Sequence, residues 1–330
     1  MLGYVGRRLF MMIPTLFAVS LVSFIIIQLP PGDFMTTYVA TLSEEGETID
    51  ADVIARLEAR YGLNQPVHVQ YYKWITNILL RGDFGYSWDW ERPVAGLIGQ
   101  RLLLTFVISL STLLFIWAVA FPIGIYSAVR QYSIGDYFFT FVSFLGRSIP
   151  SFLLALVLMW VAFSYFDQSV GGLFSPEYEE APWSVGKVRD LLSHLWIPMV
   201  VLGIGGTAGL IRIMRANLLD ELHKPYVVTA RSKGLRESRL LLKYPVRAAL
   251  NPFVSTLGWE LPRLVSGSSI IAIVLNLPTT GPLLLKALRA QDMYLAGSFI
   301  FVLSTLTVIG TLISDLLLAW LDPRIQIGQS

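Results

Sequence analysis

Residues 102–129 read LLLTFVISLSTLLFIWAVAFPIGIYSAV, a run of 28 residues without a single charged side chain. A helix needs about 17–25 mainly apolar residues to cross the hydrocarbon core of a bilayer, so this run is long enough to span a membrane. A helix on the surface of a soluble protein carries a polar stripe along one face. No such stripe is visible here, and the run therefore predicts a membrane-spanning helix.

Five further stretches pass the same length test, and the composition of the whole chain agrees with them. Residues 9–29 carry no charge and follow Arg7 and Arg8, and they lack the small-residue cleavage site of a signal peptide, so we interpret them as a retained first span. The other candidate spans are residues 137–166, 195–211, 251–277 and 295–321. Charged residues make up 15% of the chain, against about 25% in soluble domains. The fold class predicted is an all-α polytopic membrane protein with six transmembrane helices.

The positions of Lys and Arg between the spans predict the orientation, because cytoplasmic loops carry an excess of basic residues. If residues 1–8, 130–136, 212–250 and 322–330 are cytoplasmic, that side holds 13 basic and 5 acidic residues. The extracytoplasmic loops are then residues 30–101, 167–194 and 278–294, which hold 10 basic and 16 acidic residues. This bias predicts that both termini are cytoplasmic.

Several kinds of chemistry lack the residues that they require. The chain has no cysteine, which excludes disulfides, thiolate nucleophiles and Cys-ligated metals. The three histidines are scattered, and neither a phosphate-binding loop nor a Gly-x-Ser-x-Gly elbow occurs. We therefore expect no catalytic residue, no metal site and no cofactor on this chain. The net charge of +2 is too small to indicate nucleic acid by itself.

Two long segments between the spans have amphipathic patterns. In the extracytoplasmic loop, residues 52–61 and 68–80 predict two short helices, which we interpret as a helical cap over the outer mouth; a docking or gating role is compatible with it. In the cytoplasmic segment 212–250, Pro225 can begin a helix, Gly234 breaks it, and residues 235–244 resume a basic amphipathic helix. Such a hinged pair suits either anionic lipid or a groove on a partner protein, and the residues alone favour neither.

Charges inside the predicted spans need a partner or water, because each costs roughly 2.5–3.5 kcal/mol on insertion scales. Glu260 and Arg263 are three residues apart, so they can pair with each other or line a polar pathway. Arg147 has no carboxylate near it in the sequence, and we favour a place for it and for Ser148 on a translocation pathway. Asp315 is near the cytoplasmic end of the last span, and we favour a structural contact for it.

The run Tyr226-Val227-Val228-Thr229-Ala230-Arg231-Ser232-Lys233-Gly234-Leu235 resembles the cytoplasmic coupling loop of ABC-importer permeases. The likeness extends over nearly the whole chain and indicates the B-type subunit of the dipeptide/oligopeptide branch, which also includes nickel and oligosaccharide permeases. It is carried further by residues 7–15, 31–33, 61–66, 70–71, 82–87, 148–150, 247–252 and 321–324.

The resemblance implies a type I ABC-importer permease fold in a bacterial or archaeal cytoplasmic (inner) membrane. It implies that the chain forms half of a translocation pathway for peptides and pairs with a homologous second permease, two ABC ATPase subunits that bind ATP and Mg, and an extracytoplasmic solute-binding protein. The residues that it assigns to ATPase coupling are Tyr226, Thr229, Ala230, Arg231, Lys233, Gly234 and Leu235.

The solute is less well specified, because the chain departs from the family pattern inside and next to the spans. The departures are Arg147, Glu260, Arg263, Ala272 and the turn of residues 278–281. Oligosaccharides are the second hypothesis for the solute and nickel chelates the third. From other classes, an ion-coupled secondary transporter would be expected to show inverted sequence halves, which we do not see, and a membrane enzyme lacks catalytic motifs.

Overall fold

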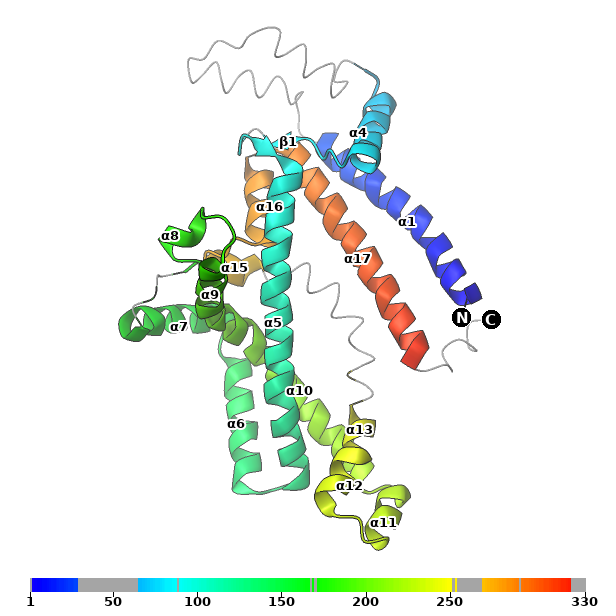
Figure 1. Ribbon diagram of the computed structural model, residues 1–330, viewed down its shortest axis with the longest axis vertical. Coiled ribbons are helices and arrows are strands. Elements are labelled where there is room, and N and C mark those ends of the chain that lie inside the picture. Colours follow the sequence, from blue (N-terminus) through cyan, green and yellow to red (C-terminus); the bar gives the residue numbers. More distant parts are fainter. Residues whose placement is uncertain are drawn as a thin grey trace.

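The computed structural model describes residues 2–28, 65–87, 89–166, 168, 171–250, 253, 269–290 and 292–321. These residues are mostly helical (Figure 1). Among the described residues, four helices are long and apolar enough to cross a membrane: α1 (Leu2–Gln28), α5 (Val94–Val129), α10 (Trp196–Leu222) and α17 (Met293–Leu321). Their outward faces are apolar, with Phe10 73% and Leu114 55% exposed, as expected for helices that face lipid.

The third predicted span forms two helices instead of one. Helix α6 (Ile134–Ser148) and helix α7 (Ser151–Phe166) meet at 102°, and together they give a fifth candidate span if a bent pair is counted as one. The reason is Pro150, which cannot donate a backbone hydrogen bond and disfavours a helical conformation in the residue before it. Ile149 is accordingly extended, with φ −78° and ψ 125°. The prediction of a single uninterrupted stretch over residues 137–166 is corrected at this point.

Helices α5 and α10 pack along much of their length, and α6 packs beside α10 (Figure 1). The close approach of α5 and α10 depends on Gly124, where an added Cβ would lie 2.7 Å from the Cβ of Met214. Real side chains do not approach so closely, so any larger residue at Gly124 would push α10 away. The two helices therefore form one packed pair.

Of the segments predicted to lie outside the cytoplasm, α4 (Val67–Arg81), the strand that follows it and α16 (Thr280–Arg289) lie at the upper end of the described residues in Figure 1, whereas the helices of residues 171–194 lie near mid-height. Helix α4 (Val67–Arg81) confirms the helix predicted over residues 68–80; the one predicted over residues 52–61 lies outside the described residues. Trp74 of α4 packs against Phe24 of α1 and Phe301 of α17. A short antiparallel hairpin, β1 (Tyr86–Ser87) and β2 (Arg92–Pro93), follows α4.

Three further described helices belong to the segments predicted to lie outside the cytoplasm. Helices α8 (Pro176–Glu179) and α9 (Val185–His194) come between α7 and α10. Lys187 of α9 is buried; it donates hydrogen bonds to the carbonyl oxygens of Glu179 and Ala181 and lies over the ring of Phe174. The last is α16 (Thr280–Arg289), which packs against the beginnings of α5 and α17.

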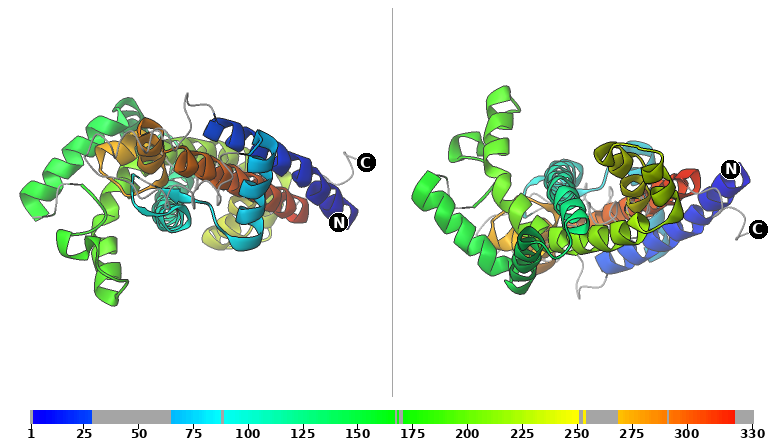
Figure 2. Two further views of the ribbon diagram at one scale, coloured as in Figure 1. Left: turned by 90° about the horizontal axis from the view of Figure 1, so that it is seen from above. Right: turned by 90° about the horizontal axis from the view of Figure 1, so that it is seen from below.

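Helices α1 and α17 lie side by side in Figures 1 and 2, and they are antiparallel. An ion pair of 2.8 Å joins Arg8, near the start of α1, to Asp315, near the end of α17. This pair confirms the prediction that Asp315 makes a structural contact. Of the predicted fifth span, the structure describes Phe253 and the residues from Ser269 onwards, where α15 (Ser269–Val274) begins.

Candidate functional site

Three short helices follow α10 at the lower end of the molecule in Figure 1: α11 (Pro225–Ser232), α12 (Glu237–Lys243) and α13 (Pro245–Ala249). Pro225 takes the first helical position, where its missing N–H leaves nothing unsatisfied. Gly234 ends the first helix with φ +74°, a left-handed conformation that favours glycine. The predicted order of helix, break and helix is confirmed, although residues 212–222 of the predicted loop are the last three turns of α10.

Helices α11 and α12 fold onto each other around a small apolar core. Val227, Ala230 and Leu240 are buried there, with Leu235 and Tyr244 packed against them. A salt bridge of 2.6 Å between Arg231 and Glu237 spans the turn at Gly234. We name α11, α12 and the turn between them (residues 225–243) the coupling unit, after the role that the resemblance implies.

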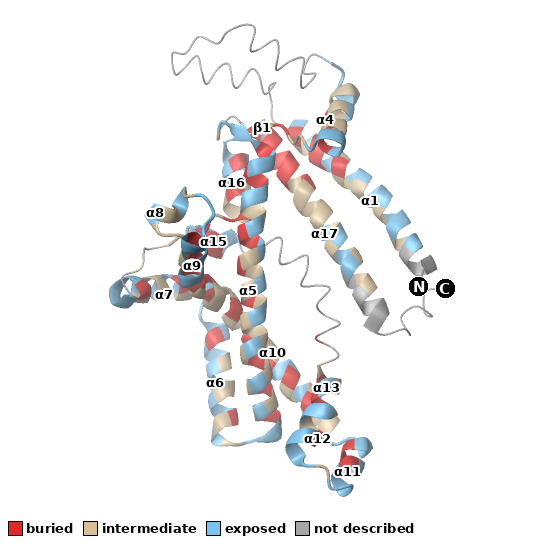
Figure 3. Cartoon of the chain, viewed as in Figure 1, coloured by how far each residue is buried: buried red, intermediate tan, exposed pale blue. Residues whose placement is uncertain are grey.

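The structure separates the seven predicted coupling residues into two groups. Tyr226, Thr229, Arg231, Lys233 and Gly234 are exposed on the coupling unit (Figure 3). Ala230 is buried and Leu235 is half-buried in its core, so these two stabilise the unit and do not form its surface.

The electrostatics of the exposed group depend on two local pairs. The Tyr226 hydroxyl donates a hydrogen bond to Glu221, and burial together with that carboxylate raises the pKa of Tyr226 to about 12. The hydrogen bond from Arg231 lowers the pKa of the Glu237 carboxyl below its ordinary value. Tyr226 is therefore neutral and Glu237 ionised near neutral pH.

Two exposed apolar side chains of the coupling unit were missed in the sequence. Val228 is 52% exposed on α11 and Leu242 is 63% exposed on α12. Neighbouring residues of a helix point about 100° apart, so Val228 points toward solvent where Val227 lies in the core. Both side chains are available for contact with a partner.

Helix α13 links the coupling unit to the membrane-spanning pair. Val246 and Ala249 pack in one apolar cluster with Met214 and Leu218 of α10 and Ala128 of α5. A displacement of the coupling unit would therefore reach α5 and α10 through buried side chains. This arrangement can convert a force applied outside the membrane into a movement of the spans.

The predicted pathway residues are only partly described. Arg147 and Ser148 are exposed at the end of α6, and Arg147 lines a hollow together with Arg212 and Arg215 of α10. Glu260 and Arg263 lie outside the described residues, so their place in a mutual pair or on a pathway stays a prediction.

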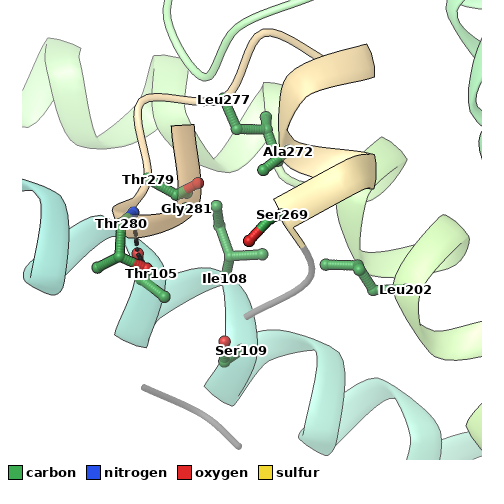
Figure 4. Close-up of a pocket in the computed structure, with 10 residues that line it drawn as sticks. All are labelled: Thr105, Ile108, Ser109, Leu202, Ser269, Ala272, Leu277, Thr279, Thr280 and Gly281. Carbon is green, nitrogen blue, oxygen red and sulfur yellow. Dashed lines mark hydrogen bonds between the residues drawn. The ribbon is translucent and has the colours of Figure 1, made fainter. Parts of the chain in front are cut away.

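A second hollow lies nearer the upper end, between α5, α10, α15 and α16 (Figure 4). The hydroxyl of Thr105 accepts a hydrogen bond of 3.0 Å from the backbone amide of Thr280, which fastens the turn before α16 to α5. Ser109 and Ser269 also line this hollow. Ala272 and the turn residues 279–281, where the sequence departs from the resembled pattern, lie on its wall. Within the described part of the chain, no three His, Asp or Glu residues gather as a metal site would require.

Comparison with known proteins now gives the family. The profile described as "Binding-protein-dependent transport system inner membrane component" matches residues 120–327, and the profile of the corresponding N-terminal region matches residues 1–111. The chain belongs to this family. The predicted recognition as an importer permease is confirmed, and the permease is a protein of the inner membrane, as expected.

Full-length relatives support the assignment. The permease is 36% identical over 328 residues to the oligopeptide transport system permease protein AppB of Bacillus subtilis, covering 99% of the chain and 100% of AppB. It is 33% identical over 328 residues to the glutathione transport system permease protein GsiC of Salmonella paratyphi A, with 99% of each covered. It is 30% identical over 360 residues to the inner membrane ABC transporter permease protein YejB of Escherichia coli O157:H7, with 98% of each covered. Its family consists of permease components, so catalysis is not the role of this chain.

Proposed function

We propose that this permease forms half of the translocation pathway of an ATP-driven importer of peptides. The observation that carries the proposal is the coupling unit, a small folded element outside the spans whose next helix, α13, is packed onto α5 and α10. A separate ATPase could bind such an element and, through the buried side chains of α13, move the membrane-spanning helices.

The partners proposed are a homologous second permease, two ABC ATPase subunits and an extracytoplasmic solute-binding protein. ATP and Mg bind to the ATPases in this scheme. ATP-driven closure of the two ATPases moves the coupling units toward each other, and the spans change from inward-facing to outward-facing. The solute-binding protein then releases its solute to the outer mouth.

The topology proposed has six transmembrane helices with both termini in the cytoplasm, in a type I importer fold. The charge bias between the spans supports this orientation. The Arg8–Asp315 pair joins the first and last spans at their terminal ends, which supports two termini on the same side of the membrane. Glu260 and Arg263 in span five are proposed to line the pathway, together with Ser148.

Peptide is the proposed solute because the relatives that span the whole chain are named for oligopeptide and glutathione transport. Uptake of a radiolabelled tripeptide by energised cells tests it, with unlabelled peptides and unlabelled oligosaccharides as competitors. We expect competition by the peptides alone.

Purification of the tagged chain from solubilised membranes tests the assembly. We expect an ATPase with a phosphate-binding loop and a second permease to be retained with it. Peptide uptake that survives depletion of ATP but collapses with a protonophore would instead indicate an ion-coupled secondary transporter. Uptake of a radiolabelled oligosaccharide that depends on this chain, without any such uptake of the tripeptide, would move the solute to sugars.

A further inference from the structure

Three arginine side chains from two helices share one hollow. Arg147 of α6 and Arg212 and Arg215 of α10 line it, together with Thr140, Ser143, Phe144 and Ile211. Among the described residues, the one acidic group that pairs with this cluster is Asp136. It holds Arg215 through two hydrogen bonds, of 3.1 Å from Nε and 2.9 Å from the terminal nitrogen Nη2.

The hollow therefore carries an excess of positive charge. Arg212 lies over the ring of Phe144, with its guanidinium carbon 5.7 Å from the ring centre, and has no acidic partner in the described part of the chain. Arg147 likewise has no acidic partner in the described part of the chain. The side chains of Arg147 and Arg212 are both exposed. One of the three charges is balanced by Asp136 and two are not, so the hollow is complementary to an anion.

The depth of the hollow corresponds to the edge of the hydrocarbon layer. The apolar run of the fourth span ends at Ile211, so Arg212 and Arg215 begin the polar part of α10. Helix α5 has 36 residues, which is about 54 Å and far longer than a core of about 30 Å, so part of it projects from the membrane, and the orientation proposed above puts the α5–α6 turn on the cytoplasmic side. Arg147 leans toward the start of α6, as helical side chains do, and shares the hollow with Thr140, seven residues nearer that start.

Apolar surface adjoins these charges. On α6, Phe141 is 62% exposed, Phe144 53% and Leu145 45%, and Ile213 of α10 is 49% exposed. A molecule with an anionic head and apolar chains could place its head among the arginines and its chains along this surface. Arginine suits a phosphodiester, because its planar fork can donate two parallel hydrogen bonds to phosphate oxygens.

We propose that this hollow binds the headgroup of an anionic phospholipid from the cytoplasmic leaflet, with Arg147 and Arg212 as the phosphate-binding residues. The proposal rests on the cytoplasmic orientation given above. It assigns Arg147 to the lipid boundary instead of the translocation pathway that the sequence favours. The bound lipid would also hold α6 and α10 together at the membrane surface, next to α13 and the coupling unit.

Lipid binding by the purified full chain tests the proposal, because it needs neither a solute nor an ATPase. Dioleoyl-phosphatidylglycerol is titrated into the detergent-solubilised protein, and bound lipid is counted by native mass spectrometry. Since one basic residue near an anionic surface contributes about 1 kcal/mol, Arg147→Gln and Arg212→Gln should each weaken binding about fivefold. Arg147→Lys, which keeps the charge, should lose less.

The matched control is Arg130→Gln, which removes an exposed arginine from the α5–α6 turn at the same end of the molecule but outside the hollow. It should bind phosphatidylglycerol as the unsubstituted chain does. Zwitterionic dioleoyl-phosphatidylcholine should bind more weakly than phosphatidylglycerol. Inorganic phosphate should not displace the lipid, because it lacks the chains that pack on the apolar surface.

Three results would overturn the proposal. Equal phosphatidylglycerol affinity in the unsubstituted chain and in both glutamine variants would show that another group, such as Glu260, neutralises the arginines. Displacement of the lipid by inorganic phosphate at equal concentration would indicate a site for a free anion. If Arg147→Gln lost peptide uptake but kept its lipid affinity, Arg147 would belong to the pathway. Loss of uptake in every variant, in contrast, would count against the proposed function and would leave the lipid site untouched.

Discussion

The buried carboxyl group of Asp292 makes the folding stability of the chain depend on pH. Asp292 is 4% exposed and accepts hydrogen bonds from the Ser87 hydroxyl and from the Leu295 amide, 3.1 Å away. Burial raises its pKa above the ordinary 3.8, the nearby charge of Asp89 adds to that rise, and the two hydrogen bonds oppose it. The folded chain therefore keeps this proton to a higher pH than the unfolded chain does.

The sign of the effect on stability follows from this difference in proton binding. Because the folded state binds more protons, the contribution of Asp292 is most favourable below its ordinary pKa and is lost as the pH rises through its folded-state pKa. We expect this contribution of Asp292 to raise the thermal midpoint of the purified chain as the pH falls from 8 to 4, against the opposite effect of carboxyl groups whose pKa is lowered, such as Glu237. Asp292→Asn should remove part of that rise, since its amide does not titrate. Parallel curves for the two proteins, measured by scanning fluorimetry, would contradict the assignment.

Single residues also mark the limits of sequence reasoning. The partner of Asp315 could be predicted only as a contact, because Arg8 is about 300 residues away in the chain and becomes a neighbour through the packing of α1 on α17. Arg147 was assigned to the pathway for want of a nearby carboxylate, and sequence spacing could not reveal that α10 brings Arg212 and Arg215 beside it. Gly234, in contrast, could be predicted from its local context alone.

At the scale of elements, the apolar runs predict most of the helices, because burial in a bilayer demands length and apolarity in one continuous stretch. The boundaries could not be predicted as well. Helix α5 begins at Val94 and α10 continues to Leu222, since polar residues extend a helix beyond the membrane without any break in hydrogen bonding. The bend of 102° at Pro150 was also missed, because a proline within an apolar run permits a mild kink as well as a sharp turn.

The coupling unit makes a prediction about its exposed surface. Val228→Asp should reduce the amount of ATPase that purifies with the chain by roughly tenfold, because burying a carboxylate in a protein contact costs more than 1.4 kcal/mol. The apolar core of the unit should be unaffected, since Val228 is 52% exposed. The measurement is the ratio of ATPase to permease after purification from membranes.

Val185→Asp provides the matched control for that experiment. Val185 is 88% exposed at the start of α9, on the side assigned to the exterior, so the same change there should leave the ratio untouched. An unchanged ratio in Val228→Asp would remove α11 from the ATPase contact.

At the scale of the whole molecule, the orientation predicts which surfaces a reagent can reach. The chain has no cysteine of its own, so single cysteines report their own positions. Leu79→Cys on α4, where the leucine is 71% exposed, should react with a membrane-impermeant maleimide in intact cells. Ser238→Cys on α12 should react only after the inner membrane is opened, and the reverse pattern would invert the topology.

If the coupling unit transmits the force of an ATPase to the spans, transport should depend on the left-handed turn at Gly234. A side chain at φ +74° costs about 1–2 kcal/mol, so Gly234→Arg should lower ATP-dependent tripeptide uptake by roughly tenfold while the chain stays in the membrane. Gly96→Arg is the matched control, because Gly96 lies at the other end of the molecule with no heavy atom within 4 Å of an added Cβ. The account predicts normal uptake in Gly96→Arg and little in Gly234→Arg; equal uptake by the two variants at equal membrane levels would contradict it.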